Sequence, residues 1–233
     1  MLIRRFTSRF LDSNTYVIAC ESSREAAVID PNGKAAPILD HVRAEGLTVR
    51  YILNTHGHLD HIWRNAEIKA ATGAPIHVHP GDAALLDRRR WWLPLVKFRS
   101  RVSPPADVLL RDGDELPLGL LTIEVLHTPG HTPGGVCFRV RKRLFTGDTL
   151  FAGGIGRVDM KGGDLKALLA SIRDKLLVLS DDIKVHPGHG PETTVERERL
   201  YNPFLRAREE LVEEFMLPRR KRTPAPAAPV EKP

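Results

Sequence analysis

One stretch of seven residues combines three histidines with an aspartate directly after a short apolar run. The run, residues 51–54, is a predicted β-strand, and the motif that follows reads THGHLDH (residues 55–61). Imidazole nitrogens and carboxylate oxygens are the ligands that zinc and other first-row metals take. A loop at the end of a strand can wrap so that these side chains point inward. The motif therefore predicts a metal site at a strand end, and it favours a fold that places such an end beside other loops.

Three further segments offer candidate ligands, each near the end of a strand-like run and each flanked by glycine. They read HTPGHTPGG, FTGDTLF and HPGHG. Glycine lets the backbone turn sharply and approach other groups closely, as small-residue loops around a metal require. Together with the first motif they supply seven ligands, enough for two metal ions that share one carboxylate. The seven candidates are His56, His58, Asp60, His61, His131, Asp148 and His189.

In their order along the chain, these motifs resemble those of the metallo-β-lactamase superfamily, and within it the glyoxalase-II-like branch of small single-domain hydrolases. The resemblance extends from about Thr15 to Phe204 and includes a further motif, GRVDM. It implies an α/β fold, a four-layer αββα sandwich. In this fold two mixed β-sheets pack face to face, helices cover the outer faces, and the metal site lies along one edge.

The resemblance also assigns the ligands to two metals. His56, His58 and His131 would hold the first metal. Asp60, His61 and His189 would hold the second, and Asp148 would bridge the two. Two divalent ions are implied, with zinc expected and iron or manganese as alternatives. Such a pair ionises a bridging water near neutral pH and polarises a carbonyl oxygen. Asp60, which would orient the nucleophile, and Asp148, which would fix the metal spacing, are the expected catalytic carboxylates.

The expected enzyme is a binuclear metallohydrolase, and the expected substrate is a small-molecule acyl thioester. Outside the ligands the sequence offers no evident general acid, and a thiolate, with an unperturbed pKa near 8.5, departs without one. The resemblance points to S-hydroxyacylglutathione. However, larger glyoxalase II enzymes carry basic residues for glutathione in an extra C-terminal helical region, whereas only about 30 residues follow Pro203 here. Recognition of glutathione therefore stays open.

An oxidoreductase is the main alternative. Persulfide dioxygenases share this fold and nearly this motif set, and the resemblance would then place one iron on His56, His131 and Asp148. Because those relatives keep the other residues, the metal content and not the motif separates the two activities. A nuclease or a lactonase of the same fold is less favoured. β-Lactamase activity is disfavoured as well, because β-lactamases are exported and the N-terminus does not read as a signal peptide.

The pattern of apolar residues predicts alternating strands and helices, as in a layered α/β protein. A strand pair is expected at 14–20 and 26–30, and single strands at 51–54, 75–79, 121–126, 135–140, 143–146 and 183–190. Helices are expected at 35–45, 62–72, 164–177, 194–201 and 204–216. The last two are separated at Asn202-Pro203, because the residue before a proline disfavours helix.

The net charge of +6 is concentrated at the C-terminus. Residues 218–233 hold five cations and one acid, which leaves about +2 for residues 1–217, so a nucleic-acid partner is not expected. This tail is rich in proline and alanine, which predicts a disordered extension of a single domain spanning 1–217. No apolar run approaches a membrane span, and two cysteines, Cys20 and Cys137, cannot form a disulfide scaffold. A cytoplasmic protein with no membrane partner is expected; the oligomeric state stays open.

Residues 85–105 break the regular pattern, with three arginines followed by WWLPLV. They are interpreted either as a loop packed on the body or as a flap over the active site. Trp91 and Trp92 in this segment are candidate substrate contacts. Arg157 is a third candidate, since a guanidinium can grip a carboxylate through two hydrogen bonds. An internal ion pair of Arg157 with Asp159 or another acid is the slightly favoured alternative.

Four more histidines could be taken for ligands: His77 and His79 alternate along one face of the strand at 75–79, and His127 and His186 flank ligand motifs. Since seven ligands already serve two metals, these four are interpreted as structural, with hydrogen bonding to a ligand as the less favoured role. His41, on a predicted helix, is expected at the surface. Asp30, at the end of the strand AAVID, is expected either to orient a metal-ligating histidine or to cap the following turn.

Overall fold

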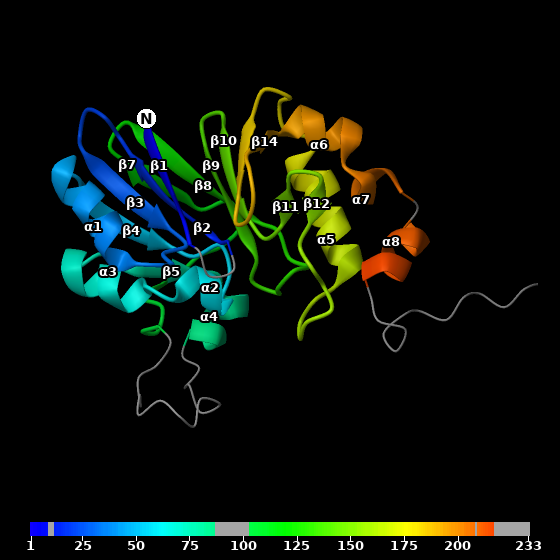
Figure 1. Cartoon of the computed structure of the whole chain (residues 1–233), viewed down its shortest axis with the longest axis horizontal. Coiled ribbons are helices and arrows are strands. Elements are labelled where there is room, and N and C mark those ends of the chain that lie inside the picture. Colours follow the sequence, from blue (N-terminus) through cyan, green and yellow to red (C-terminus); the bar gives the residue numbers. More distant parts are fainter. Residues whose placement is uncertain (9–11, 87–102, 208, 217–233) are drawn as a thin grey trace, which may run out of the picture.

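The computed structural model describes residues 1–8, 12–86, 103–207 and 209–216. Two six-stranded sheets pack face to face, α1 (Ala35–Ala44) and α3 (Asn65–Thr72) lie beside the first sheet, and α5 (Leu165–Ser171) and α6 (Val195–Tyr201) lie beside the second (Figure 1). The arrangement is the expected four-layer αββα sandwich.

The first sheet is built from the N-terminal half of the chain. Its order is β1-β2-β3-β4-β5-β6; the first three strands pair antiparallel and the last four pair parallel, so the sheet is mixed. The strands are β1 (Leu2–Thr7), β2 (Asn14–Ala19), β3 (Glu25–Ile29), β4 (Thr48–Leu53), β5 (Ile76–Val78) and β6 (Val108–Leu109).

The second sheet has the order β14-β13-β10-β9-β8-β7 and is also mixed, because β10 and β13 pair parallel among otherwise antiparallel neighbours. Its strands are β7 (Glu115–Leu118), β8 (Leu121–His127), β9 (Val136–Val140), β10 (Arg143–Gly147), β13 (Lys184–Pro187) and β14 (Thr193–Thr194). A small ribbon, β11 (Leu150–Phe151) with β12 (Gly154–Ile155), lies after β10.

Three hydrophobic clusters correspond to the three interfaces between the four layers. Because side chains alternate across a strand, Val17 packs toward α1 and α3 while its neighbours Tyr16 and Ile18 pack toward the second sheet. On β9, Phe138 faces the first sheet and Cys137 faces α5. Central strands are therefore buried on both faces, which explains why they read as nearly continuous apolar runs instead of alternating ones.

Most predicted elements are confirmed, and several differ. The helix expected at 62–72 is two helices, α2 (Leu59–Ile62) and α3, so the end of the THGHLDH motif is helical and not loop. The 164–177 helix continues after α5 as a π-helical turn, Ile172–Leu176. Helix α4 (Pro80–Leu86) was not expected, nor were the strands β1, β6, β7, β11, β12 and β14.

The boundary at Asn202-Pro203 is confirmed. Asn202 ends α6, and its side-chain oxygen accepts a hydrogen bond from the Phe204 backbone at the start of α7 (Pro203–Arg206). The last predicted helix is divided, since α8 (Glu209–Met216) follows α7 as a separate element.

Some predictions concern residues outside the described ranges. Trp91, Trp92, most of the proposed flap at 85–105 and the whole of the tail at 218–233 belong to this group. Among the helices that the structure describes, none combines the length and the hydrophobicity needed to cross a bilayer.

Candidate metal centre

The THGHLDH motif lies where β4 meets the edge between the two sheets. His56 and Gly57 follow the strand, and α2 places Asp60 and His61 on its first turn. The turn is tight at Gly57, where a Cβ atom would lie 2.6 Å from Leu85 Cβ. The other ligands come from the second sheet: His131 precedes β9, Asp148 follows β10 and His189 follows β13. The structure thus brings all seven predicted ligands together.

The first three-ligand group consists of His56, His58 and His131. One nitrogen of each ring lies within 4.8 Å of the others. His58 Nδ1 and His131 Nε2 are 2.8 Å apart, and His56 Nε2 is buried without a hydrogen-bond partner among the described residues. A lone pair buried in this way is costly unless something binds it. These nitrogens converge as the ligands of a metal would.

The second three-ligand group consists of Asp60, His61 and His189, again with ligand atoms within 4.8 Å. His189 Nε2 lies 3.2 Å from Asp60 Oδ2 and 3.3 Å from His61 Nε2. Asp60 is 15 % exposed, so its carboxylate is accessible from outside while His61 is fully buried. Oxygen and nitrogen ligands together suit zinc, iron or manganese.

Asp148 lies between the two groups. Its Oδ2 is 3.5 Å from His131 Nε2 in the first group and 3.5 Å from His189 Nε2 in the second, and its Oδ1 is 3.3 Å from His61 Nε2. Oδ1 is buried and accepts no well-formed hydrogen bond among the described residues. This is the position expected of a carboxylate that bridges two metals.

The charge states of His56, His58 and Asp148 fit metal binding. Burial would lower the pKa of His61 and of His189, but neighbouring carboxylates raise it overall, and a metal would displace a proton from these two rings. Burial, reinforced by the neighbouring imidazoles, holds the pKa of His56 well below its ordinary value, and burial together with His131 lowers the pKa of His58 to about 4. Burial would raise the pKa of Asp148, but the nearby His61, His131 and His189 lower it overall. Neutral imidazoles and an ionised carboxylate are the forms that ligate metals, so the residues present fit the implied ions.

Three of the five predicted histidine ligands are oriented through Nδ1. His61 Nδ1 hydrogen-bonds Asp30 Oδ2 at 2.9 Å, and His131 Nδ1 donates to the Arg157 carbonyl oxygen at 2.7 Å. His56 Nδ1 lies 3.1 Å from Thr55 Oγ1. These bonds leave Nε2 of each ring as the ligand atom. Of the two roles considered for Asp30, the orientation of a ligand is confirmed.

Two features that the sequence reasoning did not identify fix the loops. Asp82 is fully buried and accepts hydrogen bonds from the Gly57 N–H and the Gly134 N–H, both at 2.8 Å, so it joins the first motif to the second. Asn14 Nδ2 donates to the Pro187 and Gly190 carbonyl oxygens around His189, and the Tyr16 hydroxyl donates to the Pro187 carbonyl at 2.8 Å. The signal for Asn14 and Asp82 was their polarity beside apolar runs.

Gly188 makes a close approach that no larger residue could make. A Cβ atom there would lie 2.8 Å from His61 Cε1 and would also overlap Asp148 Oδ1. This glycine lets the HPGHG loop pass directly against two ligands, so that His189 reaches the second group.

The remaining candidates lie away from the cluster. The Arg157 side chain forms two 2.7 Å hydrogen bonds to Asp159, as the favoured alternative expected, and its carbonyl is what contacts a ligand. His79 and His127 stack on each other at 3.9 Å, and His77 packs against Tyr51. His186 packs against Phe145 and Tyr16. None of these four histidines is recorded in contact with a predicted ligand within the described chain.

Three curated proteins are similar to this chain in sequence. The chain is 38% identical to hydroxyacylglutathione hydrolase GloC of Haemophilus influenzae over 196 residues, which cover 81% of this chain and 91% of the relative. It is 37% identical to the probable metallo-hydrolase YqgX of Bacillus subtilis, covering 87% and 96%. It is also 32% identical to the human mitochondrial persulfide dioxygenase ETHE1, covering 88% and 76%.

Two solved structures are similar to this chain in fold and in sequence. The B3 metallo-beta-lactamase BLEG-1 matches with a TM-score of 0.80 at 36% identity, covering 88% of this chain and all of that one. The di-iron-bound form of TTHA1623 matches with a TM-score of 0.75 at 36% identity, covering 87% and 100%. The family model described as Metallo-beta-lactamase superfamily matches residues 8–190, a range that contains every predicted ligand. The chain therefore belongs to the metallo-β-lactamase superfamily.

Proposed function

We propose that the chain is a binuclear metallohydrolase that cleaves small-molecule acyl thioesters, as a glyoxalase II does. The observation that carries the proposal is the position of Asp148 within 3.5 Å of ligand atoms from both three-ligand groups. One shared carboxylate between two complete ligand sets suits a two-metal site better than a single-metal site. The similarity to the hydroxyacylglutathione hydrolase GloC supports the choice of a thioester.

His56, His58 and His131 would hold one ion, and Asp60, His61 and His189 the other, with Asp148 between them. Divalent cations held in such a cluster supply Lewis acidity and a water nucleophile that is ionised near neutral pH. Zinc is the expected metal, and iron or manganese would suit the same ligands.

The chain's own residues would position the reactants. Burial acts to raise the pKa of Asp60, but the hydrogen bond from His189 lowers it overall, so the Asp60 side chain is an ionised acceptor. As the partly exposed carboxylate of the cluster, Asp60 is placed to accept a hydrogen bond from the attacking water and orient it. The leaving thiolate needs no strong general acid, because its conjugate acid has a pKa near 8.5.

The test uses the full chain purified without added metal. Bound metals are quantified by mass spectrometry, and the same sample is assayed on S-lactoylglutathione. We expect about two equivalents of divalent metal and thioester hydrolysis that Asp60→Ala lowers by at least about a hundredfold. Asp40→Asn, which changes an exposed acid paired with Arg43 on α1, is the matched control and should retain full activity.

A second candidate function is persulfide oxidation with one iron on His56, His131 and Asp148. The similarity to the persulfide dioxygenase ETHE1 favours it. The same purified sample is therefore supplied with glutathione persulfide while oxygen uptake is recorded. About one equivalent of iron with oxygen consumption and no thioester hydrolysis would replace the first proposal by this one.

A further inference from the structure

A cavity of about 260 Å³ opens beside the second three-ligand group. Its lining includes Asp60 itself, together with Leu59, Trp63 and Arg64 from α2 and its C-terminal end, and Ser8 and Ser13 from the β1–β2 hairpin. Because a predicted metal ligand forms part of the wall, a substrate held at the metal centre has room to extend in this direction.

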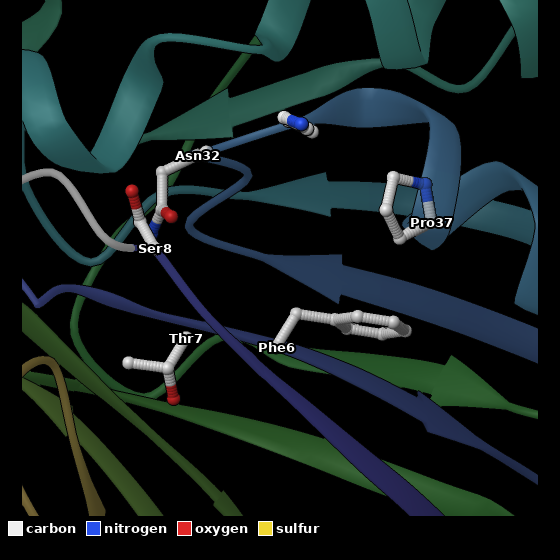
Figure 2. Close-up of a pocket in the computed structure, with 7 residues that line it drawn as sticks. Phe6, Thr7, Ser8, Asn32 and Pro37 are labelled. Atoms are coloured by element: carbon white, nitrogen blue, oxygen red, sulfur yellow. The ribbon is translucent and has the colours of Figure 1, made fainter.

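A second cavity, of about 480 Å³, adjoins the first. The two share Ser8, Asn32 and Gly33 in their linings. Figure 2 shows the second one, where the Ser8 and Asn32 side chains lie near each other at one end and the Phe6 ring and Pro37 at the other. We call the two together the side groove. It extends from Asp60 to the start of α1.

The inner part of the side groove contains an unsatisfied polar atom. Ser13 is fully buried, and its Oγ has no hydrogen-bond partner in the part of the chain that the structure describes. A buried hydroxyl without a partner is costly, and this one belongs to the lining of the cavity but has no surface accessible to a ligand. Leu59 and Trp63 supply apolar surface beside it.

The outer part of the side groove is apolar with a positive end. Phe6 and Pro37 face the space, and Lys34 lines it at the N-terminus of α1. Lys34 is exposed and forms no ion pair with any described residue, and the first turn of the ten-residue helix α1 has no acidic side chain. Both the lysine and the helix N-terminus favour a negative charge at this position.

The walls of the side groove are joined by hydrogen bonds. Arg64 Nε donates to the Gly33 carbonyl oxygen at 2.6 Å, and the Arg64 backbone N–H donates to the Pro31 carbonyl at 2.9 Å. These bonds connect the segment after β3 to the end of α2. A groove fixed in this way loses little conformational entropy when a ligand binds.

We propose that the side groove binds one arm of the substrate, an arm with an apolar stem and an anionic end that lies at Lys34. The proposal rests on the thioester hydrolase function, and it adds that this enzyme selects substrates by an arm on the Asp60 side of the centre. Either the acyl group or the thiol carrier can supply such an arm, because an apolar stem with a terminal carboxylate can belong to either side of the thioester. The probes below distinguish them.

Two matched pairs of thioesters test the proposal by activity. On the acyl side, octanoyl and suberoyl thioesters of 2-mercaptoethanol differ by a terminal carboxylate. On the thiol side, acetyl thioesters of hexanethiol and 6-mercaptohexanoate differ in the same way. We expect kcat/KM to favour the carboxylate member of one pair by about three- to fivefold, as an exposed charge pair can supply. The pair that shows the preference identifies the arm.

Substitutions of Lys34 and Trp63 test whether the side groove produces this preference. Lys34→Gln should abolish it, Lys34→Arg should retain it, and Lys166→Gln, at an exposed lysine of α5, is the matched control that should leave it unchanged. Trp63→Ala should lower kcat/KM for the long probes about tenfold relative to acetyl 2-mercaptoethanol thioester. Equal kcat/KM within both pairs, or a preference that survives in Lys34→Gln, would overturn the proposal.

A binding measurement separates this proposal from the proposed function. Monomethyl suberate and dimethyl suberate are titrated into the metal-free full chain and followed by ligand-observed NMR. We expect the monoester to bind at least about threefold more tightly, and Lys34→Gln to remove the difference. If no thioester is hydrolysed but the monoester binds more tightly, the proposed function is wrong and the anion-binding role of the side groove is supported. If thioesters are hydrolysed and the two esters bind equally, the proposed role of the side groove is wrong and the proposed function is supported.

Discussion

The two halves of the molecule build the same centre in different ways. The first sheet supplies four ligands, His56, His58, Asp60 and His61, from one continuous motif at the end of β4. The second sheet supplies three, His131, Asp148 and His189, each from a different loop. The first set is arranged by local geometry, whereas the second exists only when β9, β10 and β13 have paired.

The groups that hydrogen-bond the predicted ligands also differ between the two halves. In the first half, a side-chain carboxylate, Asp30, holds His61, while in the second half a backbone carbonyl, that of Arg157, holds His131. The dispersed ligands also depend on the first half, because Asn14 and Tyr16 hold the loop of His189. The locally encoded half therefore places its four predicted ligands through one short segment, whereas the dispersed half, which contributes a residue to each three-ligand group, requires the complete fold.

The largest effect is expected at Asp148, the predicted ligand that lies close to both three-ligand groups. Asp148→Ala removes a buried carboxylate whose neighbours are His61, His131 and His189. We expect activity to fall by at least about a thousandfold, with less than one metal retained per chain. Metal analysis and kcat/KM are measured on the same sample. A variant that keeps two metals would mean that the contiguous half and the other loops suffice without a shared carboxylate.

Asp82 tests the connection between the halves. Asp82→Ala leaves the N–H groups of Gly57 and Gly134 without their buried acceptor. Because hydrogen bonds to a charged group contribute about 1.5–3 kcal/mol each, the free energy of unfolding should fall by about 3 kcal/mol. Urea denaturation of metal-free protein measures it, with Asp40→Asn as the exposed control. A loss below about 0.5 kcal/mol would mean that the two motifs hold their positions independently.

Asp30 tests the contiguous half alone. Asp30→Asn is the suitable change because residue 30 has φ of 50°, a conformation that asparagine tolerates better than alanine. Removal of the charge beside His61 should weaken metal binding at the second group by about 10–100-fold, and binding at the first group should change less. Competition with a chelator of known affinity gives both constants. Equal weakening at both groups would contradict a purely local role for Asp30.

A substitution of Arg157 tests the dispersed half, and the expected change in activity is the smallest of the four. Its carbonyl oxygen contacts His131, whereas its guanidinium pairs with Asp159 at the surface. Arg157→Ala keeps the carbonyl, so kcat/KM should change by less than about threefold. A rise in KM of tenfold or more with an unchanged kcat would instead assign the guanidinium to substrate binding, as considered from the sequence.

Much of the centre could be predicted because its ligands carry their own signal. Histidine and aspartate beside glycine at strand ends are distinctive, and they indicated the seven residues that the structure brings together. The αββα layers were implied only by the family resemblance, and the sequence left two roles open for Asp30. The helix α2 was not predicted, because the four residues Leu59–Ile62 are too short for helical periodicity to show. Asp82, Asn14 and Tyr16 were missed for another reason. Their partners are backbone groups, up to 176 positions away in the case of Asn14, and the polarity of a side chain does not indicate which distant backbone group it binds.

The hydrogen bonds from Asn14 to the loop around His189 also join the start of the chain to a segment that is synthesised much later. A nascent chain that has emerged as far as His131 contains all three residues of the first group, but His131 takes its place only when β9, β10 and β13 have paired. The second group waits for residues 184–190 and for their attachment to the first hairpin. Neither group is therefore complete before nearly the whole domain has been translated.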